Sequence, residues 1–128
     1  MPRALIIIKN KHERSVYYCI EQWLLYKGVE VITIEYKDDI LSSSLDAEID
    51  VLVVDTEATL KKLGLRPKIT VIYRGMPRDD VPVSFNEGII VLHRSTGLYM
   101  LFRILEHYMN KSGLLLHTPI LGEELKPP

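Results

Sequence analysis

The sequence has 128 residues, 47% of them hydrophobic, and its 16 Lys and Arg nearly balance its 17 Asp and Glu. This length suits one domain with one core, and the hydrophobicity together with the balanced charge excludes a disordered chain. A formal net charge of -1 disfavours a general nucleic-acid or membrane-surface binder, which would carry a basic excess. The single Gln, with Lys and Glu supplying much of the charge, leans toward the composition of heat-adapted proteins.

The cysteine content and the N-terminal sequence limit the cellular compartments in which we expect the protein. Cys19 is the single cysteine, so a disulfide within the chain and a zinc site built on several thiolates are excluded. The apolar run 4–8 ends at Lys9 and is too short for a signal peptide or a membrane span. We therefore expect a cytoplasmic protein without a membrane-spanning segment.

Strand-like and helix-like segments alternate along the first part of the chain. The β-branched run 4–8 is typical of a strand buried on both faces. An apolar stripe at helical spacing then predicts a helix that ends near Gly28. Residues 29–36 alternate as an edge strand does, and the polar segment 38–48 predicts a loop or at most a short helix. The stripe consists of Val16, Cys19, Ile20, Trp23 and Leu24. On this stripe, Cys19 is expected to be a small core residue and not a nucleophile.

The second half of the chain continues the alternation. A buried strand is predicted at 49–54, followed by a short helix that Asp55 or Thr56 caps and that runs to about residue 63. Strands are predicted at 68–73 and 88–92, and a last helix at 98–111 or 98–112. Between those two strands, 75–87 contains two prolines and no helical stripe, so we expect an extended loop in place of a fourth helix.

The alternation of strands and helices predicts the fold class and the domain organisation. It favours parallel pairing, right-handed crossovers and helices on both faces of a sheet. The predicted class is α/β, a doubly wound and mainly parallel five-stranded sheet in the flavodoxin-like order 2-1-3-4-5. Residues 1–112 are expected to form this domain. Residues 113–128 form an apolar tail that docks on its own domain, on a sheet edge or on another subunit.

The order and spacing of these elements over residues 3–111 resemble the receiver domains of two-component response regulators. The stretch RALIIIKNKHERSVYYCIEQWLLYKGVEVITIEY reads like a receiver's first strand, first helix and second strand. The stretch IDVLVVD places Asp55 where such domains carry the phosphoacceptor, at the end of the third strand. The resemblance implies a receiver-like regulatory or protein-interaction domain.

The residues that a receiver needs for phosphotransfer are replaced in this chain. Receivers hold Mg²⁺ with an acidic pair after the first strand, and Lys9 and Asn10 stand there instead. The region around Arg74 replaces the receiver's Ser or Thr, and His93 or Arg94 corresponds approximately to its Lys. We therefore expect no phosphorylation of Asp55, with Lys9 neutralising its carboxylate.

Cationic and hydroxyl side chains follow the predicted strands, at the edge where open α/β sheets bind ligands. The stretch HRSTG also precedes the last helix, whose positive end favours an anion or a phosphate. The structural alternative is that Ser95 or Thr96 caps this helix while Lys9 pairs with Asp55. The candidate anion-binding residues are Lys9, Asn10, Asp55, Thr56, Arg74, His93, Arg94, Ser95 and Thr96.

The remaining patterns exclude several kinds of site. The four histidines lack the spacing of metal ligands, and no Walker A or dinucleotide glycine motif occurs, so we expect no metal, no cofactor and no catalytic residue. The leading hypothesis is a non-catalytic, receiver-like regulatory or interaction domain, homodimeric through the helix at 98–111 or the tail. The alternative is a small-anion or nucleotide-binding protein, including an enzyme that acts on a phosphorylated ligand at the strand ends. A protein partner fits the first hypothesis, and nucleic acid fits neither.

Overall fold

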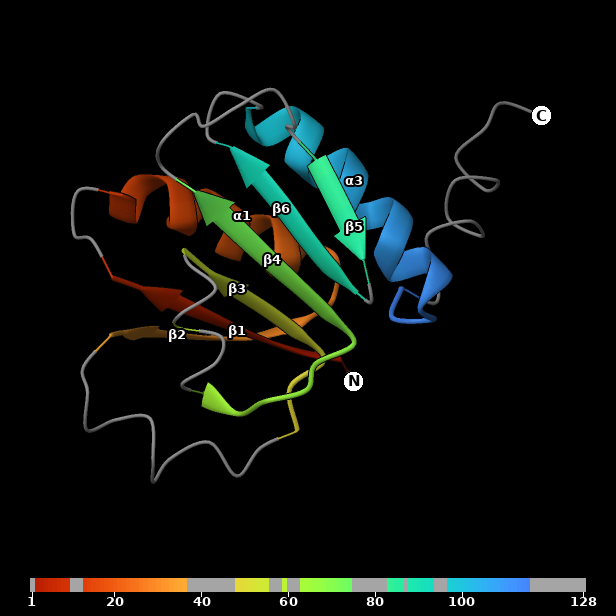
Figure 1. Ribbon diagram of the computed structural model, residues 1–128, viewed down its shortest axis with the longest axis horizontal. Coiled ribbons are helices and arrows are strands. Elements are labelled where there is room, and N and C mark those ends of the chain that lie inside the picture. Colours follow the sequence, from red (N-terminus) through yellow and green to blue (C-terminus); the bar gives the residue numbers. More distant parts are fainter. Residues whose placement is uncertain are drawn as a thin grey trace.

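The computed structural model describes residues 2–9, 13–36, 48–55, 59, 63–74, 83–86, 88–93 and 97–115. These residues form an α/β fold in which α1 and α3 cover the same face of a twisted sheet (Figure 1). The elements with assigned bounds are β1 (Arg3–Ile8), α1 (Arg14–Tyr26), β2 (Glu30–Glu35), β3 (Val51–Val54), β4 (Ile69–Arg74), β5 (Val83–Asn86), β6 (Ile89–His93) and α3 (Leu98–Lys111).

The sheet has the predicted doubly wound topology. Its order is β2-β1-β3-β4-β6-β5, and the first five of these strands are parallel. Numbered among themselves along the chain, the parallel strands follow the order 2-1-3-4-5, which confirms the flavodoxin-like prediction. Because the winding reverses at β1, right-handed crossovers place α1 and the β3–β4 connection on opposite faces.

The edge strand β5 corrects the prediction of an extended loop over 75–87. Residues 83–86 pair antiparallel with β6, so the sheet has six strands in the part of the chain that the structure describes. The sequence signal was weak because VSFN is four residues long and follows a proline, which removes a backbone donor. The rest of that predicted loop, 75–82 and residue 87, lies outside the described residues.

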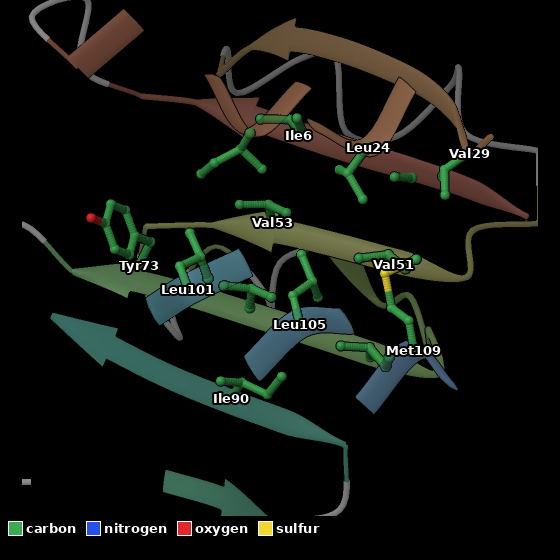
Figure 2. Close-up of a cluster of buried hydrophobic side chains, with 14 of the residues drawn as sticks. Ile6, Leu24, Val29, Val51, Val53, Tyr73, Ile90, Leu101, Leu105 and Met109 are labelled. Carbon is green, nitrogen blue, oxygen red and sulfur yellow. The ribbon is translucent and has the colours of Figure 1, made fainter. Parts of the chain in front are cut away.

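Alternating side chains of the strands build two hydrophobic clusters, one on each face of the sheet. The helix-side core joins Ala4, Ile6 and Ile8 of β1 to residues of α1 and α3. Figure 2 shows this cluster, with Leu101, Leu105 and Met109 of α3 lying against β3, β4 and β6. The far-side core contains Leu5 and Ile7 and packs against residues 63 and 65 of the β3–β4 connection. Both faces of β1 are therefore buried, as its continuous apolar run predicts.

Helix α1 forms where the stripe predicts it, but its buried face is rotated. Tyr17, Ile20 and Leu24 are the buried residues, and Cys19 is exposed. At about 100° per residue, Cys19 lies about 130° from the centre of that buried face. The prediction of Cys19 as a core residue is therefore wrong, because the stripe was centred too far from Tyr17.

Helix α3 packs beside α1 and closes the helix-side core. The rings of Trp23 and Phe102 stack with their centroids 5.0 Å apart, and Lys27 forms an ion pair with Glu106. The ammonium of Lys27 also lies 5.6 Å from the centre of the Trp23 ring. These contacts fix the two helices against each other. Neither described helix is long and apolar enough to cross a bilayer.

The start of the C-terminal tail packs on its own domain. Leu114 and Leu115 are 7% and 6% exposed and belong to the helix-side core. Residues 116–128 lie outside the described part of the chain, as do residues 38–47 of the polar segment. Of the predicted short helix, Thr59 and Leu63 have helical conformation, and residues 56–58 and 60–62 lie outside the described residues.

Two glycines with similar backbone angles provide a test of the β5–β6 turn. Gly28 and Gly88 have φ of 83° and 82°, but a Cβ at Gly88 would lie 2.6 Å from the Lys68 carbonyl oxygen, whereas a Cβ at Gly28 meets nothing within 4 Å. We expect Gly28→Ala to lower the free energy of unfolding by about 1 kcal/mol through backbone strain. Gly88→Ala should lower it by at least about 3 kcal/mol, because the methyl group also meets backbone. Urea denaturation of both variants measures the difference, and equal losses would contradict the close approach.

Candidate functional site

Four of the nine candidate residues follow or end neighbouring strands at the carboxyl edge of the sheet. Lys9 follows β1, Asp55 follows β3, Arg74 ends β4 and His93 ends β6. Arg74 and His93 are register partners, as are Ile6 of β1 and Val53 of β3. The topology thus brings these four backbone positions to one edge, as the sequence predicts. The other candidates, Asn10, Thr56, Arg94, Ser95 and Thr96, and the side chains of Arg74 and His93, lie outside the description.

The side chain of Lys9 contacts an aromatic ring at this edge. Its ammonium lies 5.1 Å from the centre of the Tyr36 ring, and Lys9 itself is exposed. An exposed contact of this kind contributes about 0.5–1 kcal/mol. Among the ion pairs of the described residues, none joins Lys9 to Asp55. The expectation that Lys9 neutralises Asp55 is therefore wrong: the aromatic ring at the end of β2 provides the alternative partner.

The carboxylate of Asp55 accepts a hydrogen bond from a buried hydroxyl group. Thr59 is 1% exposed, and its Oγ1 donates a hydrogen bond of 3.3 Å to Oδ1 of Asp55. The two residues are four positions apart, which is the spacing that brings side chains together on one turn of a helix. Asp55 is half-buried, so it is partly accessible to solvent at the carboxyl edge of the sheet.

A buried tyrosine that sequence reasoning missed lies beside Asp55. Tyr17 of α1 is 1% exposed, and its hydroxyl has no hydrogen-bond partner among the described residues. Burial raises the pKa of Tyr17 well above its usual range, and the charge of Asp55 and the Tyr73 phenol add to the rise. The sequence pattern did not indicate the burial of Tyr17, because Tyr17 lies one position away from Val16, which we placed on the apolar stripe with Ile20.

Tyr73 brings a second phenol to the same end of the helix-side core. Figure 2 shows its ring at the end of β4, with the hydroxyl pointing away from the other labelled side chains. Burial raises the pKa of Tyr73 as well. The Tyr17 phenol therefore lies within electrostatic range of both the Asp55 carboxylate and the Tyr73 phenol, at the carboxyl edge of the sheet.

The N-terminus of α3 differs from the expected capped helix. Gly97, with φ of 81°, is the N-cap residue, and a glycine has no side chain to accept a hydrogen bond from the first turn. The predicted capping residues Ser95 and Thr96 lie outside the described residues. Within the described residues, no group of three or more His, Cys, Asp or Glu side chains could hold a metal ion.

Comparisons do not connect this geometry to a known protein. No family model, no curated protein and no solved structure matches the chain. The doubly wound α/β fold is compatible with many activities, so it does not select one. Functional inference therefore rests on the surfaces and side chains of this chain.

The unpartnered hydroxyl of Tyr17 has a measurable effect on stability. Removing it by Tyr17→Phe should raise the free energy of unfolding by about 1 kcal/mol, because a buried group without a partner is removed while the ring stays. Tyr17→Ala, the control, should lower it by about 3–5 kcal/mol through loss of the ring. Chemical denaturation at neutral pH measures both, and a clear loss in Tyr17→Phe would contradict the unpaired hydroxyl.

The same residue predicts a pH dependence. The pKa of Tyr17 is raised in the folded chain, so above about pH 10 the unfolded chain releases this proton while the folded chain keeps it. This difference in pKa has no effect on the free energy of unfolding below that pH, and it lowers the free energy of unfolding progressively as the pH rises above it. The decline of stability above about pH 10 should therefore be shallower in Tyr17→Phe than in wild type.

Proposed function

We propose that the chain is a non-catalytic, receiver-like interaction domain that pairs with a second copy of itself through the exposed side of α3, without phosphorylation of Asp55. The supporting observation is a set of large apolar side chains exposed on the two helices that cover one face of the sheet. Tyr18, Leu25, Tyr26, Tyr99 and Met100 are between 47% and 78% exposed. Exposed apolar surface of this kind commonly marks an association surface.

The exposed side of α3 has the composition of an interface. Tyr99 is 71% exposed and Met100 is 47% exposed, and both lie in the first turn of the helix. Arg103 donates a hydrogen bond of 3.1 Å to the Tyr99 hydroxyl, and its guanidinium lies 5.7 Å from the centre of that ring. Tyr, Met and Arg are the residue types enriched in protein interfaces. Arg103 also holds the Tyr99 ring in one orientation, which lowers the entropy lost on binding.

A second copy is the partner that this surface fits. Twofold pairing is the commonest symmetry of soluble oligomers, and it brings the same patch of each subunit together. Tyr99 of one copy then meets the region of Tyr99 and Arg103 in the other, so that rings and guanidinium groups alternate. Glu106 on the same helix is paired with Lys27, and we expect the positive charge of Arg103 to lie against an aromatic ring of the other copy.

The absence of phosphotransfer is supported by the residues around Asp55. Lys9 stands where a receiver carries an acidic residue, and Mg²⁺ requires oxygen ligands that a lysine cannot provide. Asp55 itself accepts a hydrogen bond from Thr59. One carboxylate with a hydroxyl donor suits a structural or ligand-contacting role better than acyl-phosphate chemistry.

Substitutions on α3 test the pairing. We expect light scattering at micromolar concentration to give a dimer mass for wild type and a monomer mass for Tyr99→Glu and for Met100→Lys, because each buries an unpaired charge in the interface. Arg66→Glu, at an exposed position of the β3–β4 connection on the opposite face of the sheet, should stay dimeric. Ile104 is unsuitable for this test, since it packs partly buried against the helix-side core.

Two results would overturn this assignment. A monomer mass for wild type at this concentration would exclude the homodimer. Dissociation by Leu25→Glu on α1, with Tyr99→Glu still dimeric, would move the interface from α3 to the other helix.

A second candidate function is binding of a small anion or a nucleotide at the strand ends. It is favoured because Lys9 contacts Tyr36 and not Asp55, and because the N-cap residue of α3 is a glycine, which has no side chain to cap the helix. An exposed ammonium and the N–H groups of a helix N-terminus are both suited to a phosphate. An enzyme acting on a phosphorylated ligand belongs to this second candidate.

Thermal unfolding with added phosphate or ATP tests the second candidate. A ligand at about 100 times its dissociation constant adds roughly 2.7 kcal/mol of stability. If this candidate is right, the melting temperature of wild type should rise with either probe, and Lys9→Ala should reduce the rise. Lys111→Ala, at the opposite end of α3, should leave the rise unchanged. No rise with either probe would remove the candidate and leave the interaction domain in place.

A further inference from the structure

A pocket distinct from the surroundings of Asp55 lies between α1 and the edge strand β2. Its volume is about 300 Å³, which is at the lower end for small-molecule sites. Arg14, Tyr18 and Glu21 line it from α1, at spacings of four and three residues that share one side of the helix. Ile8, at the end of β1, lies in its wall, and Glu35, the register partner of Ile8, ends β2. The pocket thus opens at the carboxyl edge, where α/β sheets bind ligands.

The charges that line this pocket are not balanced. Arg14 forms an ion pair with Glu35, so these two charges neutralise each other. Glu21 accepts a hydrogen bond from the hydroxyl of Thr33 and has no ion-pair partner among the described residues. A neutral hydroxyl satisfies one lone pair of a carboxylate and leaves its negative charge uncompensated. The described residues that line the pocket therefore carry one excess negative charge, on Glu21.

The other lining groups suit the body of such a ligand. Tyr18 is 58% exposed, so its ring is available to a ligand in the pocket. The face of a tyrosine ring attracts an ammonium or a guanidinium group, as the Lys9 and Tyr36 contact at the same edge illustrates. Ile8 offers an apolar surface that can cover a short hydrocarbon stem.

We propose that the pocket between α1 and β2 binds a small organic cation, an alkylammonium or alkylguanidinium whose charged head pairs with Glu21 and whose stem lies on Tyr18 and Ile8. This binding does not depend on the dimer proposed for α3, because Tyr99 and Met100 do not line the pocket. An anionic ligand is disfavoured here by Glu21, which separates this pocket from the phosphate candidate at the strand ends.

Titrations of the full chain test the proposal with matched probes. We expect n-butylammonium and n-butylguanidinium to shift the backbone amide resonances of Ile8, Thr33 and Glu35 saturably, with dissociation constants in the millimolar range or below. Neutral 1-butanol and anionic butyrate should bind at least about tenfold more weakly, since they lack the charge that Glu21 recognises.

Variants separate the contribution of the carboxylate from that of the ring. Glu21→Gln keeps an acceptor for Thr33 and should weaken cation binding at least about tenfold. Tyr18→Ala should weaken it several-fold, and Tyr18→Phe, which keeps the ring face, should bind as wild type does. Glu48→Gln removes an exposed carboxylate that does not line the pocket and should change nothing.

Four outcomes would overturn the proposal. They are equal binding of butanol and butylammonium, unchanged affinity in Glu21→Gln, no saturable shift up to about 50 mM probe, and saturable binding of a capped lysine tripeptide when neither small cation binds. The last would assign the pocket to a partner protein's side chain. Dimer mass is measured on the same samples, so failure of cation binding and failure of dimerisation are distinguishable.

Discussion

The burial of β1 on both of its faces is the constraint on which the rest of the structure depends. Residues 4–8 of this strand are between 0% and 7% exposed, and β1 pairs with β2 on one side and β3 on the other. A parallel strand in this position must be covered by separate segments above and below, which is why α1 and the β3–β4 connection lie on opposite faces. The same arrangement points the ends of β1, β2 and β3 toward one edge. Both ligand hypotheses, at Asp55 and at the α1–β2 pocket, concern side chains that this arrangement of strands places near that edge.

The contacts between α1 and α3 connect the core to the surfaces proposed for association. Trp23 stacks on Phe102 and Lys27 pairs with Glu106, so the two helices present their outer sides in a fixed relation. A stable frame of this kind lowers the entropy that an interface must overcome. The exposed apolar residues therefore lie on rigid elements rather than on loops. The pocket beside α1 benefits likewise, because Tyr18 and Glu21 are held at helical spacing opposite a paired strand.

Much of the fold could be predicted because its signals are local. The apolar runs of β1, β3 and β4 and the stripe of α3 are long or strongly periodic, and their bounds agree with the predictions to within two residues. Two kinds of feature were not predictable. The strand β5 is four residues long and is stabilised by pairing with β6, a contact between segments and not a propensity. The exposure of Cys19 depends on how α1 is rotated against the sheet, and its apolar residues alone allow more than one rotation.

The sequence by itself determined the order of the five parallel strands, the two helices and the residue types that reach the carboxyl edge, because hydrophobic periodicity marks each element and the handedness of crossovers then limits how the elements can be arranged. Only the tertiary structure decided which of those residues meet. Lys9 contacts Tyr36 and not Asp55, Tyr17 replaces Cys19 on the buried face of α1, and Glu21 accepts a hydrogen bond from Thr33 of β2. The direction of each side chain and the packing around it select one arrangement among several in these cases. The sequence pattern does not record either of them.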